Sequence, residues 1–171
     1  ADGEGGNSPQ QYDARVHLQR RNQRDTAGKL YELPKPTLAA LPGPAAGAGL
    51  SLALSCDLRY ASPNAIMTTA FARVGFSGDY GGTYFMSRLI GSAKARELYF
   101  LSERVDMVEA ERLGLVNGVF PEESLQDDVH AIARRLAEGP TVAYRYMKEN
   151  LNRAMSGEMG ECLDMVAAHH I

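Results

Sequence analysis

The feature that most constrains the fold of this chain is an uncharged stretch at residues 38–56, which prolines and glycines interrupt. The stretch is long enough to cross a bilayer, but Pro42 and Pro44 would break a spanning helix, and its many Ala, Ser and Gly residues supply little transfer free energy. We therefore expect no membrane span. Because residues 1–11 are polar and lack the apolar segment of a signal peptide, we expect a cytoplasmic protein.

Within this stretch the pattern predicts a strand, a turn and a helix. Residues 37–41 form a short apolar run bounded by prolines, which favours a buried strand. The sequence Gly47-Ala48-Gly49 then precedes residues 50–55, which are good helix formers. Residues 57–61 and 65–69 have the character of two further strands. The expected architecture is therefore an α/β fold, in which a sheet is mixed with helices.

The rest of the chain is expected to be mostly helical. Residues 1–11 are typical of a mobile loop, residues 12–33 of one weakly packed polar helix, and residues 76–82 (FSGDYGG) of a glycine-rich loop. One strand is expected to return at residues 115–120. Helices are predicted at residues 83–90, 93–101, 107–113, 124–138, 141–155 and 160–170.

Composition excludes several classes of protein. With 171 residues, 44% hydrophobic and 23% charged, the chain fits one ordinary globular domain. A net charge of −3 gives no basic surface, so nucleic acid is not an expected partner. Cys56 and Cys162 lie far apart and outside any CxxC or histidine-rich pattern, so we expect no metal site and two buried thiols.

The Gly47-Ala48-Gly49 turn is the first candidate for chemistry. A helix N-terminus exposes unpaired backbone N–H groups and the positive end of the helix dipole, and glycine lets a ligand oxygen approach that backbone closely. Such a turn can bind an anion or a carbonyl oxygen. The glycines would also suit a place where strand and helix only need to pack tightly, and the motif alone leaves both interpretations open.

Asp79 is the second candidate, in the loop Gly78-Asp79-Tyr80. An acid on a glycine-rich loop before a helix can act as a general base, act as a nucleophile or cap the helix. Phe71, Tyr80 and Tyr84 could supply an apolar wall, and desolvation there would raise the pKa of the carboxyl group.

Two other interpretations use the same glycine turn. A dinucleotide-binding fingerprint would need a third glycine and a later acid, and the sequence has neither at the required spacing. The sequence Gly49-Leu50-Ser51 is similar to the start of a nucleophile elbow, which would make Ser51 the nucleophile of a serine hydrolase, with Asp79 as the acid and His169 or His170 as the base.

Three segments, in their order and spacing, resemble the crotonase superfamily, also called the enoyl-CoA hydratase/isomerase family. The resemblance runs from Lys35 to about His170. It rests on KPTLAALPGPAAGAGLSLALSCDLRYAS, on GFSGDYGGTYFMSRLIGSAKARELYF and on ERLGLVNGVFP.

The resemblance implies a crotonase-like spiral of ββα units, followed by an all-helical C-terminal region that forms homotrimers or hexamers. An acyl-CoA thioester would be the substrate, with coenzyme A as part of that substrate and no separate cofactor. By motif position the Ala48 N–H would bind the thioester oxygen, together with a second N–H from an earlier loop. The residues expected to line the substrate site are Gly47, Gly49, Phe71, Gly78 and Tyr80.

The departures from the family pattern concern the acids. Hydratases of the family use two glutamates around a water molecule, and the matching positions here hold Ser51 and Phe71, so two-glutamate hydration is not expected. Asp79 instead matches the working aspartate of dienoyl-CoA isomerases and of 4-chlorobenzoyl-CoA dehalogenase. We expect it to act as an acid/base, because the dehalogenase also needs a histidine from the upstream region, and no such histidine is recognised in this sequence. The alternatives are an aspartate nucleophile, as in a hydrolase or dehalogenase, a non-catalytic CoA-binding or trimer-forming member, and, more distantly, the serine hydrolase.

Family members usually carry a further stretch before this one and a further helix after it, so the resemblance implies a chain shortened at both ends. We expect a partial crotonase core over residues 1–110, with a loop and helix at 1–34 and the sheet and active-site region at 35–110. A strand and a helical region would follow over residues 111–171. The sequence indicates neither the acyl group nor the pathway.

Overall fold

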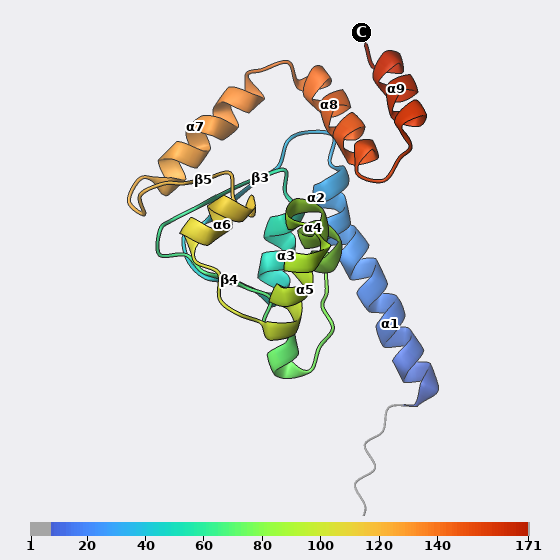
Figure 1. Cartoon of the computed structure of the whole chain (residues 1–171). Coiled ribbons are helices and arrows are strands. Elements are labelled where there is room, and N and C mark those ends of the chain that lie inside the picture. The colour runs from blue at the N-terminus through green and yellow to red at the C-terminus, as the bar shows by residue number, and fades with distance from the viewer. Residues whose placement is uncertain (1–7, 171) are drawn as a thin grey trace, which may run out of the picture.

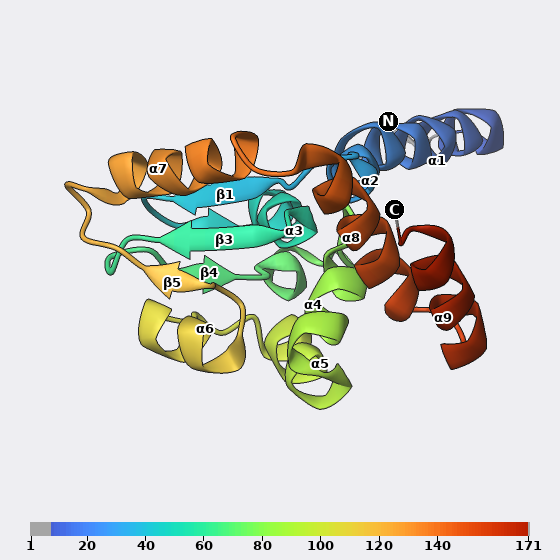
Figure 2. The same cartoon turned by 90° about the horizontal axis from the view of Figure 1, so that it is seen from above.

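The computed structural model describes residues 8–170. Its centre consists of two small parallel sheets, seen from above in Figure 2. In one sheet the order is β1-β3-β5, and in the other β2 pairs with β4. The strands are β1 (Leu38–Leu41), β2 (Ala45–Ala46), β3 (Leu58–Ala61), β4 (Met67–Thr68) and β5 (Gly118–Val119).

The strand pairing makes the spiral visible. The chain runs β1, β2 and then helix α3 (Gly47–Ser55), and continues with β3, β4 and further helices. Because β3 lies parallel to β1 and β4 lies parallel to β2, equivalent strands of successive units are neighbours. The expected α/β architecture of ββα units is therefore confirmed, although the strands are shorter than the apolar runs that predicted them.

The uncharged helix α3 lies at the middle of the core. It packs against β2, β4 and α4 (Gly82–Ile90), and α4 packs in turn against α5 (Ser92–Leu101). Buried on α3 are Leu50, Ser51, Ala53, Leu54 and Ser55. A helix surrounded in this way can carry no charged side chain without a partner, which explains its composition.

The N-terminal helix projects from this core (Figure 1). It runs through α1 (Pro9–Gln23), a π-helical turn (Arg24–Gly28) and α2 (Lys29–Glu32). No residue of α1 is buried, which confirms the weak packing. The expected loop over residues 1–11 is wrong for its last residues, since the Ser8 hydroxyl caps the helix by accepting from the Gln11 N–H. Its first seven residues lie outside the described part of the chain.

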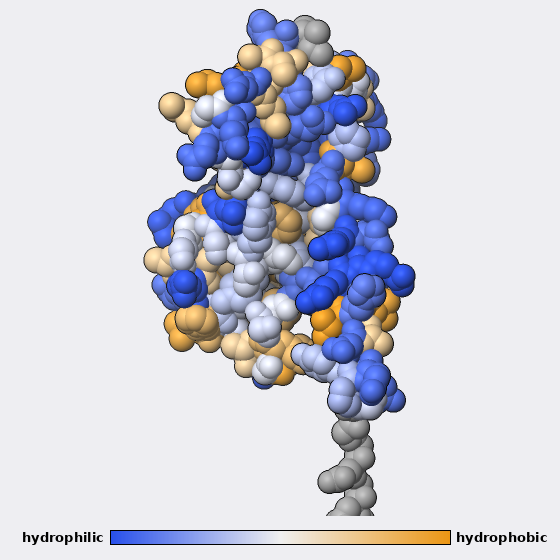
Figure 3. All heavy atoms as spheres, turned by 90° about the vertical axis from the view of Figure 1, so that its right-hand side faces the viewer, coloured by the Kyte–Doolittle hydropathy of each residue, from blue (hydrophilic) through white to orange (hydrophobic). Residues whose placement is uncertain are grey.

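The predicted C-terminal helices are present. They are α6 (Met107–Leu113), α7 (Leu125–Ala137), α8 (Thr141–Ala154) and α9 (Met159–Ala168). Helix α7 lies along the sheet beside β1 (Figure 2), whereas α8 and α9 pack on each other and form an upper lobe joined to the body by a narrow waist (Figure 3).

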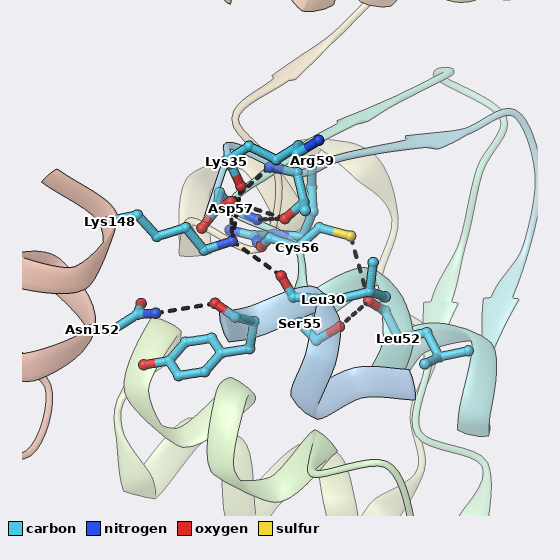
Figure 4. Close-up of polar contacts among 11 residues, drawn as sticks. Leu30, Lys35, Leu52, Ser55, Cys56, Asp57, Arg59, Lys148 and Asn152 are labelled. Carbon is cyan, nitrogen blue, oxygen red and sulfur yellow. Dashed lines mark hydrogen bonds and ion pairs between the residues drawn. The ribbon is translucent and has the colours of Figure 1, made fainter. Parts of the chain in front are cut away.

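Lys148 of α8 ties that lobe to the core (Figure 4). Its buried ammonium group donates to the carbonyl oxygens of Leu30 at 3.0 Å and Lys35 at 3.3 Å. It also forms an ion pair with Asp57, with 2.8 Å between Nζ and Oδ2. The same Oδ2 accepts from the backbone N–H of Thr37 at 2.7 Å. Helix α8 is therefore fastened to α2, to the segment between α2 and β1, and to the residue that precedes β3.

None of the helices between residues 8 and 170 is both long and apolar enough to cross a membrane.

Candidate functional site

The Gly47-Ala48 turn is the start of α3, so the helix includes the glycines that were expected to precede it. Gly47 has a φ of +50°, a backbone conformation that favours glycine. A β-carbon on Gly49 would meet nothing within 4 Å, so tight packing does not explain that glycine. The Ala48 N–H lies in the first helical turn, where no carbonyl of the helix is available to it. This end of α3 therefore suits a ligand oxygen.

Phe71 supplies an apolar wall beside this turn. It begins a short 3₁₀-helix (Phe71–Val74) and is 7% exposed. Its ring is the nearest side chain to Gly47, at 3.7 Å from the position of an added β-carbon. It also stacks on the ring of Tyr99, with 6.1 Å between centroids and 11° between planes.

Asp79 lies half-buried in the loop before α4. Its Oδ1 atom is buried and has no hydrogen-bond partner among the described residues. The helix is capped by Gly81, with no side-chain hydrogen bond, so Asp79 does not cap it. Burial raises the pKa of the Asp79 carboxyl group and the Ser51 hydroxyl lowers it, with a net rise. An unpaired carboxyl oxygen of raised basicity is what a general base requires.

The loop around Asp79 has an unusual backbone. Gly78, Tyr80 and Gly81 have φ values of +125°, +44° and +72°. For Tyr80 this conformation costs about 1–2 kcal/mol, because its Cβ crowds the following carbonyl. Strain of this kind is commonly found at functional sites.

Ser51 and Tyr99, together with Phe71 and Asp79, form a cluster of four side chains near the start of α3. The role of Tyr99 was not predicted from the sequence. Ser51 is 1% exposed, and its hydroxyl donates to the Gly47 carbonyl oxygen at 3.2 Å. A β-carbon on Gly82 would lie 2.3 Å from Ser51 Oγ and 2.4 Å from the Tyr99 hydroxyl oxygen, so both hydroxyls face the same space. Burial raises the pKa of Tyr99 to about 12, which keeps its hydroxyl protonated at neutral pH.

Tyr84 does not belong to this wall, contrary to the expectation. Its ring packs edge-on against Tyr31 and Phe85, and the Arg88 guanidinium lies 3.6 Å above it. Tyr84 lines a cavity of about 360 Å³ together with Cys56, which ends α3 on the side away from Ala48. Tyr99, one helix further along, takes the place that the sequence assigned to Tyr84.

The histidines and cysteines lie elsewhere. The Nδ1 atom of His169 is 2.8 Å from Asn150 Oδ1, and the His169 ring packs on Tyr146, so its partners are on α8. No histidine contact to Ser51 is found between residues 8 and 170, which removes the base that a serine hydrolase needs.

Cys56 and Cys162 are half-buried free thiols rather than fully buried ones. The described residues contain no group of three or more His, Cys, Asp or Glu side chains that could hold a metal ion.

Successive ββα units whose equivalent strands pair in parallel, with a glycine turn that opens the central helix, fit the crotonase-like fold that the sequence resembles. The model of the family described as enoyl-CoA hydratase/isomerase matches residues 5–168. This chain therefore belongs to the enoyl-CoA hydratase/isomerase family, the crotonase superfamily.

Known relatives agree on the fold. A crystal structure of an enoyl-CoA hydratase/isomerase from Cupriavidus metallidurans superimposes with a TM-score of 0.86 at 33% identity, covering 95% of this chain and 60% of that one. The 1,2-epoxyphenylacetyl-CoA isomerase of Escherichia coli is 35% identical over 80% of this chain and 52% of its own length. The 4-chlorobenzoyl coenzyme A dehalogenase-1 of an Arthrobacter species is 33% identical over 79% of this chain and 49% of its own length. The chain spans about half the length of the curated relatives it matches.

Proposed function

We propose that this chain is the part of an acyl-CoA enzyme in which Asp79 acts as acid/base while the Ala48 N–H binds the thioester oxygen. The observation that carries the proposal is the buried, unpartnered Oδ1 of Asp79, in a cluster that Ser51 connects to the Gly47-Ala48 turn. Leaving a buried acceptor unpaired costs about 1–3 kcal/mol, more for a charged one. A substrate proton directed at Oδ1 would compensate for that cost.

The reaction would be a proton transfer on the acyl chain. Asp79 takes a proton from a carbon made acidic by the thioester, the C–H electron pair moves toward the thioester oxygen, and an enolate forms. The Ala48 N–H and the positive end of α3 stabilise this oxyanion, and one such donor contributes about 3–4 kcal/mol. Returning the proton to another carbon moves the double bond.

Ser51 and Phe71 bear on whether the reaction is an isomerisation or a hydration. Neither side chain can serve as the carboxylate pair of a two-glutamate hydratase, so Asp79 is the one side chain among the described residues of this cluster that supplies a carboxylate. We therefore favour isomerisation over hydration. The 1,2-epoxyphenylacetyl-CoA isomerase among the relatives supports this class of chemistry.

A second candidate is an aspartate nucleophile, favoured by the dehalogenase relative and by the stacked rings of Phe71 and Tyr99 beside the cluster. Here an Asp79 oxygen bonds to an activated acyl carbon, the leaving group departs, and water splits the resulting ester. A single turnover in H₂¹⁸O distinguishes the two reactions, because only ester hydrolysis leaves ¹⁸O in the Asp79 carboxylate.

We further propose that the complete protein acts as a cytoplasmic homotrimer or hexamer through its C-terminal helices. Helices α8 and α9 leave large apolar side chains exposed, which an assembly would cover. These are Val142, Met147, Leu151, Met159, Leu163 and Val166. Light scattering of the complete protein gives the number of subunits.

The test of the function is turnover of a short panel of enoyl-CoA thioesters, followed as double-bond migration and as hydration. We expect migration that Asp79→Asn reduces about 10²- to 10⁴-fold. Asp127→Asn, an exposed acid at the start of α7, is the matched control and keeps its activity. Binding of the thioesters without turnover by the parent protein would favour a non-catalytic member of the family, and turnover that Asp79→Asn leaves unchanged would contradict the role of Asp79.

A further inference from the structure

Hydrogen bonds tie the end of α5 to the segment that carries Phe71. The Thr69 hydroxyl donates to the Leu98 carbonyl oxygen at 2.9 Å, and its oxygen lies 3.3 Å from the Ser102 hydroxyl oxygen. Arg73, in the 3₁₀-helix that begins at Phe71, donates from Nη2 to the Ser102 carbonyl oxygen at 2.7 Å. Thr69 and Leu98 are 29 residues apart in sequence, so these bonds fix the position of one segment on another.

The hydroxyl groups of Thr69 and Ser102 are buried. Thr69 is 2% exposed and Ser102 is 0% exposed. Water cannot easily replace a lost partner at such a depth, so each hydroxyl depends on the hydrogen bonds that the protein supplies. A valine could fill the space of Thr69, but it could make neither of the two bonds.

The backbone at Ser102 makes serine an unexpected residue there. Its φ is +50°, in the left-handed region where glycine is favoured and other residues are strained. Glycine would remove the strain, but it would also remove the hydroxyl. The contact of that hydroxyl with Thr69 gives serine a purpose at this position.

These bonds lie directly beside the aromatic stack of the candidate site. The carbonyl that accepts from Thr69 belongs to Leu98, and the next residue is Tyr99. The Tyr99 ring stacks on Phe71, with 6.1 Å between centroids. Phe71 is in turn the nearest side chain to Gly47, at 3.7 Å from an added β-carbon. Each ring of the stack therefore lies within two residues of an anchored position.

We propose that Thr69 and Ser102 are positioning residues, whose hydroxyl groups hold Phe71 on Tyr99 and thereby fit the apolar wall to the acyl group. Both act through Phe71 and not by contact with the substrate. Arg73 supports the same arrangement from the 3₁₀-helix. The effect on the acyl group rests on the proposed function, whereas the position of the Phe71 ring can be measured without any substrate.

The first test follows the Phe71 ring by ¹⁹F NMR in the complete protein labelled with 4-fluorophenylalanine. The Phe71 signal is assigned by its loss in Phe71→Leu, and Tyr99→Leu gives its position without the stacked ring. In Thr69→Val we expect the signal to move toward that position. In Thr69→Ser, which keeps the hydroxyl, it should stay near the parent value.

Ser102→Gly separates positioning from folding. Because glycine suits the left-handed backbone, we expect no loss in Tm, yet the Phe71 signal should still move. Thr26→Val is the matched control, since its hydroxyl also donates to a backbone carbonyl, that of Asn22 at 2.7 Å, but on the exposed N-terminal helix. Its Phe71 signal should equal that of the parent. An unmoved signal in both Thr69→Val and Ser102→Gly overturns the proposal.

The second test measures the binding of butyryl-CoA, a saturated thioester with no double bond to move, by calorimetry. We expect Thr69→Val to raise the dissociation constant about 10-fold, because a displaced wall fits the acyl group less well. Partial unfolding alone would lower the number of binding sites and leave the dissociation constant of the folded protein unchanged. An unchanged dissociation constant overturns the role of the two hydroxyls in fitting the wall.

The proposal and the proposed function fail separately. If Asp79→Asn leaves turnover unchanged while Thr69→Val displaces the Phe71 signal and weakens binding, the reaction assigned to Asp79 is wrong and the positioning stands. If turnover depends on Asp79 while the Phe71 signal ignores Thr69 and Ser102, the positioning is wrong and the reaction stands.

Discussion

Gly82 is the point at which the cluster can be disturbed with one methyl group. In Gly82→Ala the new β-carbon would lie 2.3 Å from Ser51 Oγ, 2.4 Å from the Tyr99 hydroxyl oxygen and 3.1 Å from Ser51 Cβ. Rotation of the serine alone cannot relieve this crowding, because its β-carbon is close as well. Gly82 is the first residue of α4 and its φ lies outside the left-handed range, so the effect comes from contact and not from backbone strain.

The expected loss of stability follows from two opposing terms. Overpacking of a buried site costs about 1–3 kcal/mol. Replacing glycine by alanine at a helix start returns a few tenths of a kcal/mol, up to about 1 in a helix interior. We therefore expect a net loss of about 1–2 kcal/mol, or about 3–6 °C in Tm for a chain of this size. Displacement of Ser51 and Tyr99 should also reduce proton transfer by about 10²-fold.

Thermal unfolding followed by circular dichroism, at one protein concentration, measures the first effect, and the enoyl-CoA assay measures the second. Gly160→Ala is the control, since a β-carbon in that part of α9 meets nothing within 4 Å. It should leave activity unchanged and stabilise the protein by up to about 1 kcal/mol. A Gly82→Ala protein as stable and active as its parent would refute the convergence of the two hydroxyls on Gly82.

Three further perturbations test other parts of the account. Lys148→Met should lower the free energy of unfolding in urea by about 2–4 kcal/mol, because it leaves Asp57 and two carbonyl oxygens without their cation. Lys29→Met removes an exposed ion pair with Asp25 and should lower it by under about 0.5 kcal/mol. Equal losses in the two variants would contradict the role of Lys148 in holding α8 to the core. Asp79 has a folded pKa above its unfolded value, so its ionisation opposes folding as pH rises. Asp79→Asn should therefore raise Tm more at about pH 8 than at about pH 4, and a gain of the same size at both values would refute the shift. Gly47→Ala should lower the free energy of unfolding by about 1–2 kcal/mol, because φ is positive at this position. Gly49→Ala should not lower stability, since an added β-carbon meets nothing there. Equal stability of the two variants would contradict the requirement for glycine at position 47.

The parts of the fold set by local patterns could be predicted from the sequence. The prolines and the uncharged run between them indicate the first strand and α3, and the amphipathic segments indicate the later helices. The strand lengths were overestimated, because an apolar run marks burial whether or not its residues pair in a sheet. The start of α1 was misplaced, since the cap at Ser8 followed by Pro9 was not recognised.

The site residues that lie in glycine-containing turns could be predicted from the sequence. Those whose position depends on how the helices pack could not. Gly47, Ala48 and Asp79 lie in glycine-containing turns, so their neighbours along the chain indicate their role. Tyr99 has no such signal, because a tyrosine on an amphipathic helix can face either way and only the arrangement of α3, α4 and α5 brings it to Ser51. Tyr84 was assigned to the wall by its closeness in sequence, yet α4 turns it to the opposite side, against Tyr31.

The central claim is that Asp79 removes a proton from a bound acyl-CoA, and isotope exchange tests it most directly. The complete protein and its Asp79→Asn variant would each be incubated in D₂O with an enoyl-CoA thioester, and deuterium in the acyl chain would be measured by mass spectrometry. We expect rapid incorporation by the parent protein and a rate about 10²- to 10⁴-fold lower in the variant, with binding of the thioester unchanged. Equal incorporation by both proteins would contradict the role of Asp79.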